Sequence, residues 1–255
     1  MARDPVEVLD ERAPAPTRTT AYGTDPAQVY DVRLPPAGAP VRDLAVVVVH
    51  GGFWREEYDR GHASMQAQAL ADAGYPTAVV EYRRTGMPGG GWTGAADDIA
   101  AAIAAIRTDP AFTAPLVLVG HSAGGQLSTW AAAQPWAQGL RGVVSLAGVL
   151  DLSHGQATGV GGGAIGAFLG GTPEQVPDAY AAADPVHLPP GTPVVLVHAR
   201  DDEEVPFELS ERYAAAHLGP RVRLAAVPEG GHYGLIDPAN PAFAHVLAAV
   251  DLLSS

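Results

Sequence analysis

Short apolar runs recur along the chain, and glycine, proline or charged residues separate them. In the runs 44–49 and 116–119, aliphatic residues follow one another with no polar position between them. Such uninterrupted runs are typical of strands that are buried on both faces of a parallel sheet. The pattern predicts strands at residues 28–34, 44–49, 77–82, 116–119, 142–146, 194–198 and 222–227.

Helical periodicity fills most of the intervals between these strands. The predicted helices lie at residues 63–73, 92–108, 125–133, 208–218 and 241–253. Strands and helices therefore alternate, as a mostly parallel central sheet flanked by helices requires. We expect an α/β fold in a single domain of residues 1–255. A Pro- and Ala-rich N-terminal arm, residues 1–25, is expected to lie over the surface or over the mouth of a functional site.

The interval 151–186 differs from the rest of the chain because it is rich in glycine and lies between two predicted core strands. Two interpretations stay open. The segment can form a short, mobile cap insertion that excludes water from a reaction site. It can equally be an irregular loop with one short helix.

The run that ends at Val119 leads directly into Gly-His-Ser-Ala-Gly, residues 120–124. A serine between small residues, after a strand and before a helix, is typical of a nucleophile elbow. The turn strains the backbone and exposes the hydroxyl group, which its small neighbours tolerate. Ser122 is therefore the predicted nucleophile.

A serine nucleophile needs a base and an acid that orients the base. Asp202 follows the strand predicted at 194–198, and His232 lies in a glycine-rich segment after the strand at 222–227. The order Ser122, Asp202, His232 is the order of the α/β-hydrolases, each residue lying after the carboxyl end of a strand. Asp201 is a rival for the acid and is expected to face solvent instead.

The segment His50-Gly-Gly-Phe-Trp54 follows another predicted strand. Adjacent glycines allow backbone amides to approach a ligand closely. The amides of Gly52, Phe53 and Ala123 are the predicted oxyanion hole, which stabilises the negative oxygen of a tetrahedral intermediate.

With these residues the chain resembles the esterase and lipase branch of the α/β-hydrolases that carries His-Gly-Gly-x. This branch includes hormone-sensitive-lipase-like esterases and kynurenine formamidases. The resemblance extends from about residue 31 to the C-terminus, and Tyr82-Arg83 and the Asp202-x-x-Val-Pro segment also carry it. It implies the α/β-hydrolase fold.

Phe53 stands where hormone-sensitive-lipase-like members usually have a third glycine. His-Gly-Gly-x-Trp looks like the pattern of eukaryotic-type kynurenine formamidases, although small bacterial carboxylesterases carry similar loops. Ala199 stands where relatives often have glycine, which can shift the acid loop slightly. The resemblance implies hydrolysis of a small ester or an aryl formamide through an acyl-enzyme.

Aromatic residues near these segments are candidates for the wall of the substrate pocket, with ordinary core packing as the alternative. They are Phe53, Trp54, Tyr58, Phe168 and Tyr233. His50 and His121 are expected to orient loops, and His121 is expected to point away from the nucleophile. Asp151 is expected to be a turn or cap residue.

Composition narrows the possible functions. The net charge of −13 disfavours nucleic acid and anionic membranes as partners. The sequence contains neither cysteine nor lysine, which excludes thiolate and Schiff-base chemistry. The histidines lack metal-ligand spacing, so we expect no metal and no cofactor. No stretch resembles a signal peptide or a membrane-spanning helix, so we expect a cytoplasmic protein.

Several alternatives stay open at this point. A lactone hydrolase, another amide hydrolase or an acyltransferase can use the same triad. A ligand receptor without catalysis can use the same fold, although such a receptor would typically lose the nucleophile or the histidine. The expected partner is a small-molecule ester or amide. The sequence leaves the oligomeric state open, a homodimer included.

Overall fold

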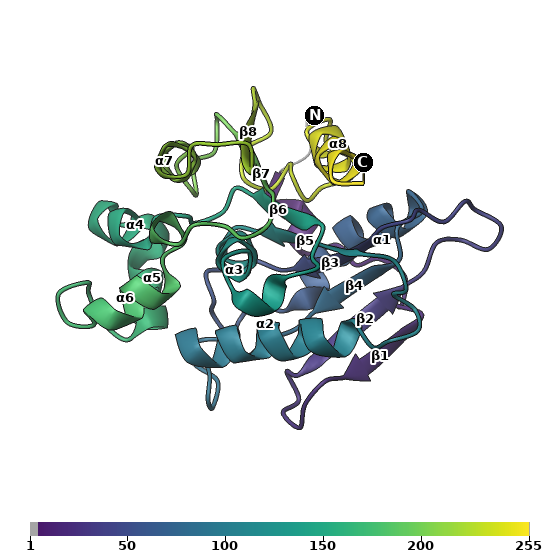
Figure 1. The fold of residues 1–255 in the computed structure, drawn as a ribbon, viewed down its shortest axis with the longest axis horizontal. Coiled ribbons are helices and arrows are strands. Elements are labelled where there is room, and N and C mark those ends of the chain that lie inside the picture. The colour runs from purple at the N-terminus through teal and green to yellow at the C-terminus, as the bar shows by residue number, and fades with distance from the viewer. Residues whose placement is uncertain (1–4, 255) are drawn as a thin grey trace.

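The computed structural model describes residues 5–254, so the first four residues of the predicted arm and Ser255 lie outside the described residues. One eight-stranded sheet crosses the molecule (Figure 1). Its strands are β1 (Arg18–Ala21), β2 (Val29–Arg33), β3 (Ala45–Val49), β4 (Thr77–Val80), β5 (Leu116–His121), β6 (Gly142–Leu146), β7 (Val194–Ala199) and β8 (Val222–Val227). All seven strand predictions are therefore confirmed within a few residues.

The strand order across the sheet is β1-β2-β4-β3-β5-β6-β7-β8. Strand β2 pairs antiparallel with β1 and β4, and the pairs from β4 to β8 are parallel. The carboxyl ends of β5, β7 and β8 therefore meet at one edge of the sheet. This edge is where ligands bind in open α/β sheets.

Helices cover both faces of the sheet (Figure 1). The longer ones are α1 (Ser64–Asp72), α2 (Trp92–Ile106), α3 (Ala123–Ala131), α7 (Glu208–Ala216) and α8 (Phe243–Leu252), which confirms the five predicted helices. Val46 and Val48 pack with α1 and α8, whereas Val47 and Val49 pack with α2 and α3. This alternation is the two-residue period of a strand that is buried on both faces.

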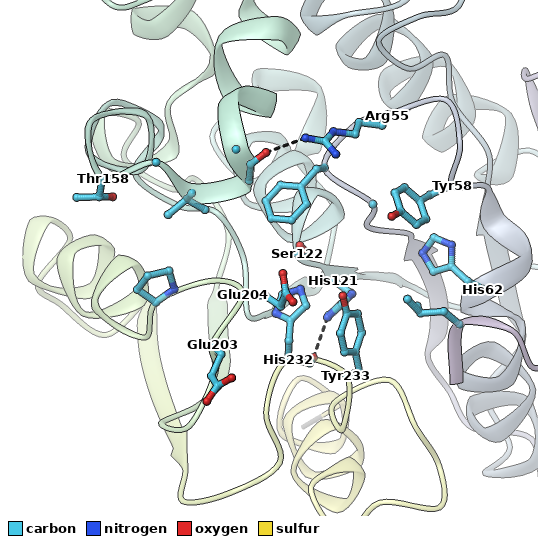
Figure 2. A pocket seen from close by; sticks show the side chains of 18 residues that line it. Arg55, Tyr58, His62, His121, Ser122, Thr158, Glu203, Glu204, His232 and Tyr233 are labelled. Carbon is cyan, nitrogen blue, oxygen red and sulfur yellow. Dashed lines mark hydrogen bonds between the residues drawn. The ribbon is translucent and has the colours of Figure 1, made fainter. Parts of the chain in front are cut away.

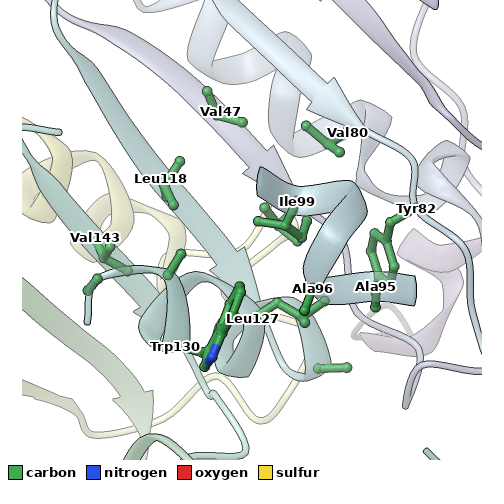
Figure 3. Packing of buried hydrophobic residues seen from close by; sticks show 14 of the residues in the cluster. Val47, Val80, Tyr82, Ala95, Ala96, Ile99, Leu118, Leu127, Trp130 and Val143 are labelled. Atoms are coloured by element: carbon green, nitrogen blue, oxygen red, sulfur yellow. The ribbon is translucent and has the colours of Figure 1, made fainter. Parts of the chain in front are cut away.

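The core on the α2 and α3 side is dense in aliphatic and aromatic side chains. Figure 3 shows Val47 and Leu118 of the sheet facing Ile99 of α2 and Leu127 of α3. All four side chains are at most 1% exposed. Together with α1 and α8 on the other face, this packing holds the strand ends, and the residues that follow them, in fixed positions.

The sequence analysis missed strand β1 (Arg18–Ala21), which lies within the segment predicted to be a surface arm. Thr19 pairs with Asp31 across the antiparallel β1-β2 ladder, and Arg18 forms an ion pair with Asp109 at 2.5 Å. The prediction of an arm is wrong for these residues. They form an edge strand of the sheet. Their backbone groups pair with β2 on one side, and within residues 5–254 no strand pairs with them on the other.

The glycine-rich interval contains more regular structure than an irregular loop with one helix. It comprises α4 (Leu152–Thr158), the 3-10 turn η4 (Val160–Gly163), α5 (Ala164–Leu169), α6 (Pro177–Ala183) and the 3-10 turn η5 (Pro185–His187). The glycines of η4 have positive φ angles, 71° at Gly161 and 58° at Gly162. The interval therefore packs as three short helices joined by turns that need glycine.

No helix within residues 5–254 is long and apolar enough to cross a membrane.

Candidate active site

Ser122 lies in a sharp turn between β5 and α3. Its φ and ψ angles are 55° and −117°, a conformation that a residue with a side chain rarely adopts. A Cβ atom on Gly120 would lie 2.1 Å from the Gly124 carbonyl oxygen, and one on Gly124 would lie 2.1 Å from that of Val49. The two glycines thus permit the tight turn and the contact between α3 and β3 that the elbow prediction requires.

Asp202 and His232 meet at the carboxyl edge of the sheet, in the loops after β7 and β8. The His232 Nδ1 atom lies 2.8 Å from Asp202 Oδ2. The His232 side chain is 4% exposed and that of Asp202 is fully buried. This pairing leaves the His232 Nε2 atom available for another partner, because Nδ1 is engaged with the carboxylate.

The Asp202 carboxylate accepts hydrogen bonds from several groups. Its Oδ1 atom accepts the amides of Glu204 at 2.9 Å and Val205 at 2.8 Å. Its Oδ2 atom also lies 3.2 Å from His198 Nε2. Burial alone would raise the pKa of Asp202, but the hydrogen bonds from His198, His232 and Val205 hold it well below its ordinary value. Asp202 is therefore ionised at neutral pH.

The sequence analysis missed His198, the fifth residue of β7. Its Nδ1 atom lies 2.8 Å from Ser210 Oγ, and its Nε2 atom lies 2.9 Å from the Val205 carbonyl oxygen. Two acceptors, Val205 and Asp202, face Nε2, so Nε2 carries the proton and the Ser210 hydroxyl donates to Nδ1. A polar residue inside an apolar strand run was the available signal for this site.

Asp201 and Asp151 have the structural roles that the sequence favours. Asp201 is exposed, and its carboxylate accepts the amides of Gly230 at 3.2 Å and Gly231 at 2.9 Å. It therefore braces the loop that carries His232 rather than only facing solvent. Asp151 caps α4 by accepting the His154 amide, which confirms the prediction of a cap residue.

His121 contacts His232 directly. Its Nε2 atom lies 3.0 Å from the His232 carbonyl oxygen, and the two rings are 4.5 Å apart. His121 and Ser122 line the same cavity, and the expectation that the His121 side chain points away from Ser122 stays a prediction. The expectation that it orients a loop is supported by the hydrogen bond. Burial, and then the neighbouring His232, lower the pKa of His121 well below its ordinary value.

The loop after β3 has an unusual backbone. Gly52, Phe53 and Trp54 have φ angles of 102°, 48° and 54°. A Cβ atom on Gly51 would lie 3.0 Å from Ser122 Cβ, so the loop passes directly against the nucleophile. Two successive non-glycine residues with positive φ cost about 1–3 kcal/mol each, which surrounding contacts must offset.

A buried charged cluster anchors this loop at His50. The His50 ring lies between the Gly51 carbonyl oxygen and Glu81 Oε1, each at 2.9 Å. The Tyr82 hydroxyl donates to the His50 carbonyl oxygen at 2.9 Å, and Arg84 pairs with Glu81. The sequence analysis did not identify Glu81, which is 3% exposed and follows β4. These contacts supply part of the rigidity that the strained backbone requires.

A cavity of about 650 Å³ opens above Ser122. Figure 2 shows Tyr58 and His62 on one side of Ser122 and Thr158 on the other. The cavity is lined by Leu9, Gly52, Phe53, Arg55, Tyr58, His62, His121, Ser122, residues 158–162, Glu203, Glu204, Pro206, His232 and Tyr233. Leu9 belongs to η1 (Pro5–Leu9), so part of the predicted N-terminal arm lies at the site.

The cavity wall contains three of the five predicted aromatic residues, Phe53, Tyr58 and Tyr233. The prediction is wrong for Trp54 and Phe168. Trp54 is fully buried, and its ring stacks on that of Phe168 at 4.5 Å. The Trp54 Nε1 atom donates to Gln126 Oε1 at 3.1 Å. The backbone of Trp54 has a positive φ angle and its ring lies in the core. The pattern of apolar and polar residues in the sequence does not show this orientation.

Within the described range 5–254, no group of three or more His, Cys, Asp or Glu side chains is arranged to hold a metal ion.

The BD-FAE family model matches residues 30–216, nearly three quarters of the chain. The chain belongs to the BD-FAE family. No curated protein sequence matches it.

Solved structures similar to this BD-FAE member include three esterases. A truncated carbohydrate esterase from gut microbiota has a TM-score of 0.77 at 19% identity, covering 95% of this chain and 99% of its own. Esterase B from Lactobacillus rhamnosis has a TM-score of 0.76 at 18% identity, covering 98% and 90%. Est2 from Thermogutta terrifontis has a TM-score of 0.72 at 21% identity, covering 96% and 95%. The protein has the α/β-hydrolase fold.

Proposed function

We propose that the protein is a serine hydrolase that cleaves small carboxylic esters through an acyl-enzyme on Ser122. One observation carries the proposal. Ser122, in its strained turn, and His232, bound at Nδ1 to Asp202 at 2.8 Å, line the same cavity. These positions support Ser122 as the nucleophile, His232 as the base and Asp202 as the orienting acid of a Ser-His-Asp mechanism. The esterase titles of similar structures support the choice of substrate bond.

The acylation step uses the free nitrogen of His232. The His232 Nε2 atom takes the Ser122 proton while Oγ attacks the ester carbonyl carbon. Asp202 holds the imidazole in the tautomer that presents Nε2 and stabilises its charged form. The tetrahedral intermediate then collapses, the carbon–oxygen bond to the alcohol breaks, and the alcohol leaves with the proton from His232.

Deacylation repeats these transfers with water as the nucleophile. His232 takes a proton from water, the hydroxide attacks the acyl carbon, and Ser122 Oγ leaves with that proton. The products are a carboxylic acid and the free enzyme. All proton transfers of the two steps thus run between Ser122, His232, the leaving alcohol and water.

The proposed oxyanion hole consists of the amides of Gly52, Phe53 and Ala123. Ala123 is the first residue of α3, so its amide has no acceptor within the helix. The loop that carries Gly52 and Phe53 lies against Ser122. An amide directed at the developing oxyanion typically lowers the barrier by about 2.7–4 kcal/mol.

Residues 151–186 are proposed to act as a short cap over the site, in a single catalytic domain. The Arg55 side chain donates to the Gly161 carbonyl oxygen at 2.8 Å and so joins the oxyanion loop to η4. A Cβ atom on Gly161 would also lie 2.6 Å from the Phe53 ring. A cap held against this loop limits the room above Ser122, which favours small acyl groups.

The test compares short p-nitrophenyl esters with N-formylkynurenine as substrates, with Ser122→Ala as the control. We expect ester hydrolysis that Ser122→Ala abolishes, and much slower cleavage of the formamide. A strong preference for the formamide would favour the kynurenine formamidase assignment that the His-Gly-Gly-x-Trp pattern suggests. Absence of Ser122-dependent turnover of either substrate would contradict the proposal.

A further inference from the structure

His62 is a polar residue of the cavity wall that takes no part in the proposed reaction. His62 lies in the 3-10 turn η2 (Arg60–Ala63), and 6% of its surface is exposed. Its ring lines the cavity that contains Ser122 (Figure 2). Within residues 5–254, no group forms a hydrogen bond with the His62 ring nitrogens. This is unusual, because buried polar groups nearly always have a partner.

The unused hydrogen-bonding capacity of His62 faces the cavity. Among the described residues 5–254, nine side-chain polar atoms are completely enclosed without a partner, and none of them belongs to His62. The ring of His50 lies 5.3 Å from the His62 ring and that of Tyr58 lies 6.2 Å from it. The charged groups of Asp59, Arg12 and Arg84 are also near but form no hydrogen bond with it. A molecule in the cavity can therefore supply the partner that the protein does not.

The backbone around His62 is held firmly in place. Asp59 caps η2 by accepting the Gly61 amide at 2.8 Å. The Arg60 amide donates to Glu81 Oε2 at 2.9 Å, and its side chain pairs with Asp31 at 2.9 Å. The imidazole is thus positioned in advance, and such preorganisation favours specific recognition.

The chemistry of the ring selects the kind of group it can bind. Burial, and next the neighbouring His50, lower the pKa of His62 to about 3, so the ring is neutral at pH 7. A neutral imidazole has one donor nitrogen and one acceptor nitrogen. A hydroxyl group both donates and accepts, whereas a carboxylate only accepts and an ammonium only donates. An uncharged hydroxyl is the best match.

We propose that His62 is a specificity residue that binds a hydroxyl group of the substrate on the side of Ser122 opposite Thr158 (Figure 2). The inference rests on the proposed esterase function and adds the chemical class of its substrate, an ester that bears a hydroxyl group. His62 is not a second base, because no carboxylate is hydrogen-bonded to its ring.

The experiment measures kcat/KM for three esters that differ by their hydroxyl groups. Propyl butyrate is the reference, 2,3-dihydroxypropyl butyrate adds hydroxyls to the alcohol, and propyl 3-hydroxybutyrate adds one to the acyl group. The wild type is expected to prefer one hydroxylated ester by about five- to tenfold, the effect of one neutral hydrogen bond. His62→Phe is expected to remove this preference, measured as the ratio of kcat/KM on the hydroxylated ester to kcat/KM on propyl butyrate.

His62→Gln is the conservative variant, because its amide also donates and accepts, and it is expected to keep only part of the preference. If His62→Phe fails to fold, the His62→Gln variant is the test. A preference for the hydroxylated ester in His62→Gln as large as that of the wild type would overturn the proposal. Equal rates of the wild type on the three esters, or a preference that survives in folded His62→Phe, also overturn it. Failure of the proposed function differs from these results, since the wild type would then hydrolyse none of the esters in a Ser122-dependent way.

Discussion

The Nε2 atom of His198 lies 3.2 Å from the Oδ2 atom of Asp202. The same oxygen binds His232 Nδ1 at 2.8 Å, so one buried carboxylate atom faces two imidazoles. His198 restricts the positions that the carboxylate can take and stabilises its charge. Its own orientation is fixed by Ser210 on α7. The position of Asp202 is therefore fixed by the loop after β7 and, through His198 and Ser210, by helix α7.

His198→Phe should reduce kcat by about 10- to 100-fold with little change in KM. The variant removes a hydrogen bond to a buried charge, and such bonds contribute about 1.5–3 kcal/mol. Steady-state kinetics on a p-nitrophenyl ester would measure the effect, with circular dichroism as the check on folding. Unchanged kcat in a folded variant would show that His198 does not position Asp202.

Asp202→Asn should reduce kcat by about 10⁴-fold, because an amide no longer holds the imidazole in the productive tautomer. Asp201→Asn is the matched control at the neighbouring position. Asp201 accepts only the Gly230 and Gly231 amides, so this change should cost less than about tenfold. If the two variants had equal activity, or if Asp201→Asn lost more, the acid would be assigned wrongly.

Trp54→Ala should lower the free energy of unfolding by about 3–5 kcal/mol, because it leaves a large hole in the core. Tyr58→Ala, at a side chain that is 39% exposed, should change that free energy by less than about 1 kcal/mol but should alter KM. Urea denaturation and ester kinetics on both variants separate the two roles. If Tyr58→Ala were destabilised and Trp54→Ala were as stable as the wild type, the assignment of Trp54 to the core and of Tyr58 to the cavity wall would be wrong.

The buried histidines should make stability depend on pH. Burial lowers the pKa of His62 to about 3, from an ordinary value of 6.5. Below pH 6.5 the unfolded chain therefore binds a proton that the folded protein does not, and stability falls as the pH is lowered towards 3. One such group contributes a slope of up to about 1.4 kcal/mol per pH unit.

Unfolding measured between pH 5 and 7 should show a smaller slope in His62→Gln than in the wild type. The charged and titratable groups around His62 are His50, Asp59, Arg12 and Arg84, and the variant leaves them in place. Parallel curves for the two proteins would mean that His62 takes up its proton equally in both states.

The positions of the three proposed triad residues could be predicted because each follows the end of a strand, and apolar runs show strand ends clearly. Strand β1 could not be predicted, because Arg18-Thr-Thr-Ala21 is short and three of its four residues are polar, and it forms by pairing with β2. Such an edge strand carries no hydrophobic period.

The sequence also could not predict the direction in which an individual side chain points. Trp54 and Phe168 pack together although 113 positions of sequence separate them, and the backbone at Trp54 decides which way its ring points. His62 also belongs to no sequence motif, so nothing in the sequence gives a reason to select it. It became informative only when its burial, its lack of a protein partner and its place in the cavity were known together.

The most direct test of the account is covalent labelling with a p-nitrophenyl alkylphosphonate, followed by mass spectrometry. We predict one phosphonyl group per chain, on Ser122, with loss of ester hydrolysis in proportion to labelling and no labelling of Ser122→Ala. Labelling at another residue, or full esterase activity in Ser122→Ala, would contradict the central claim.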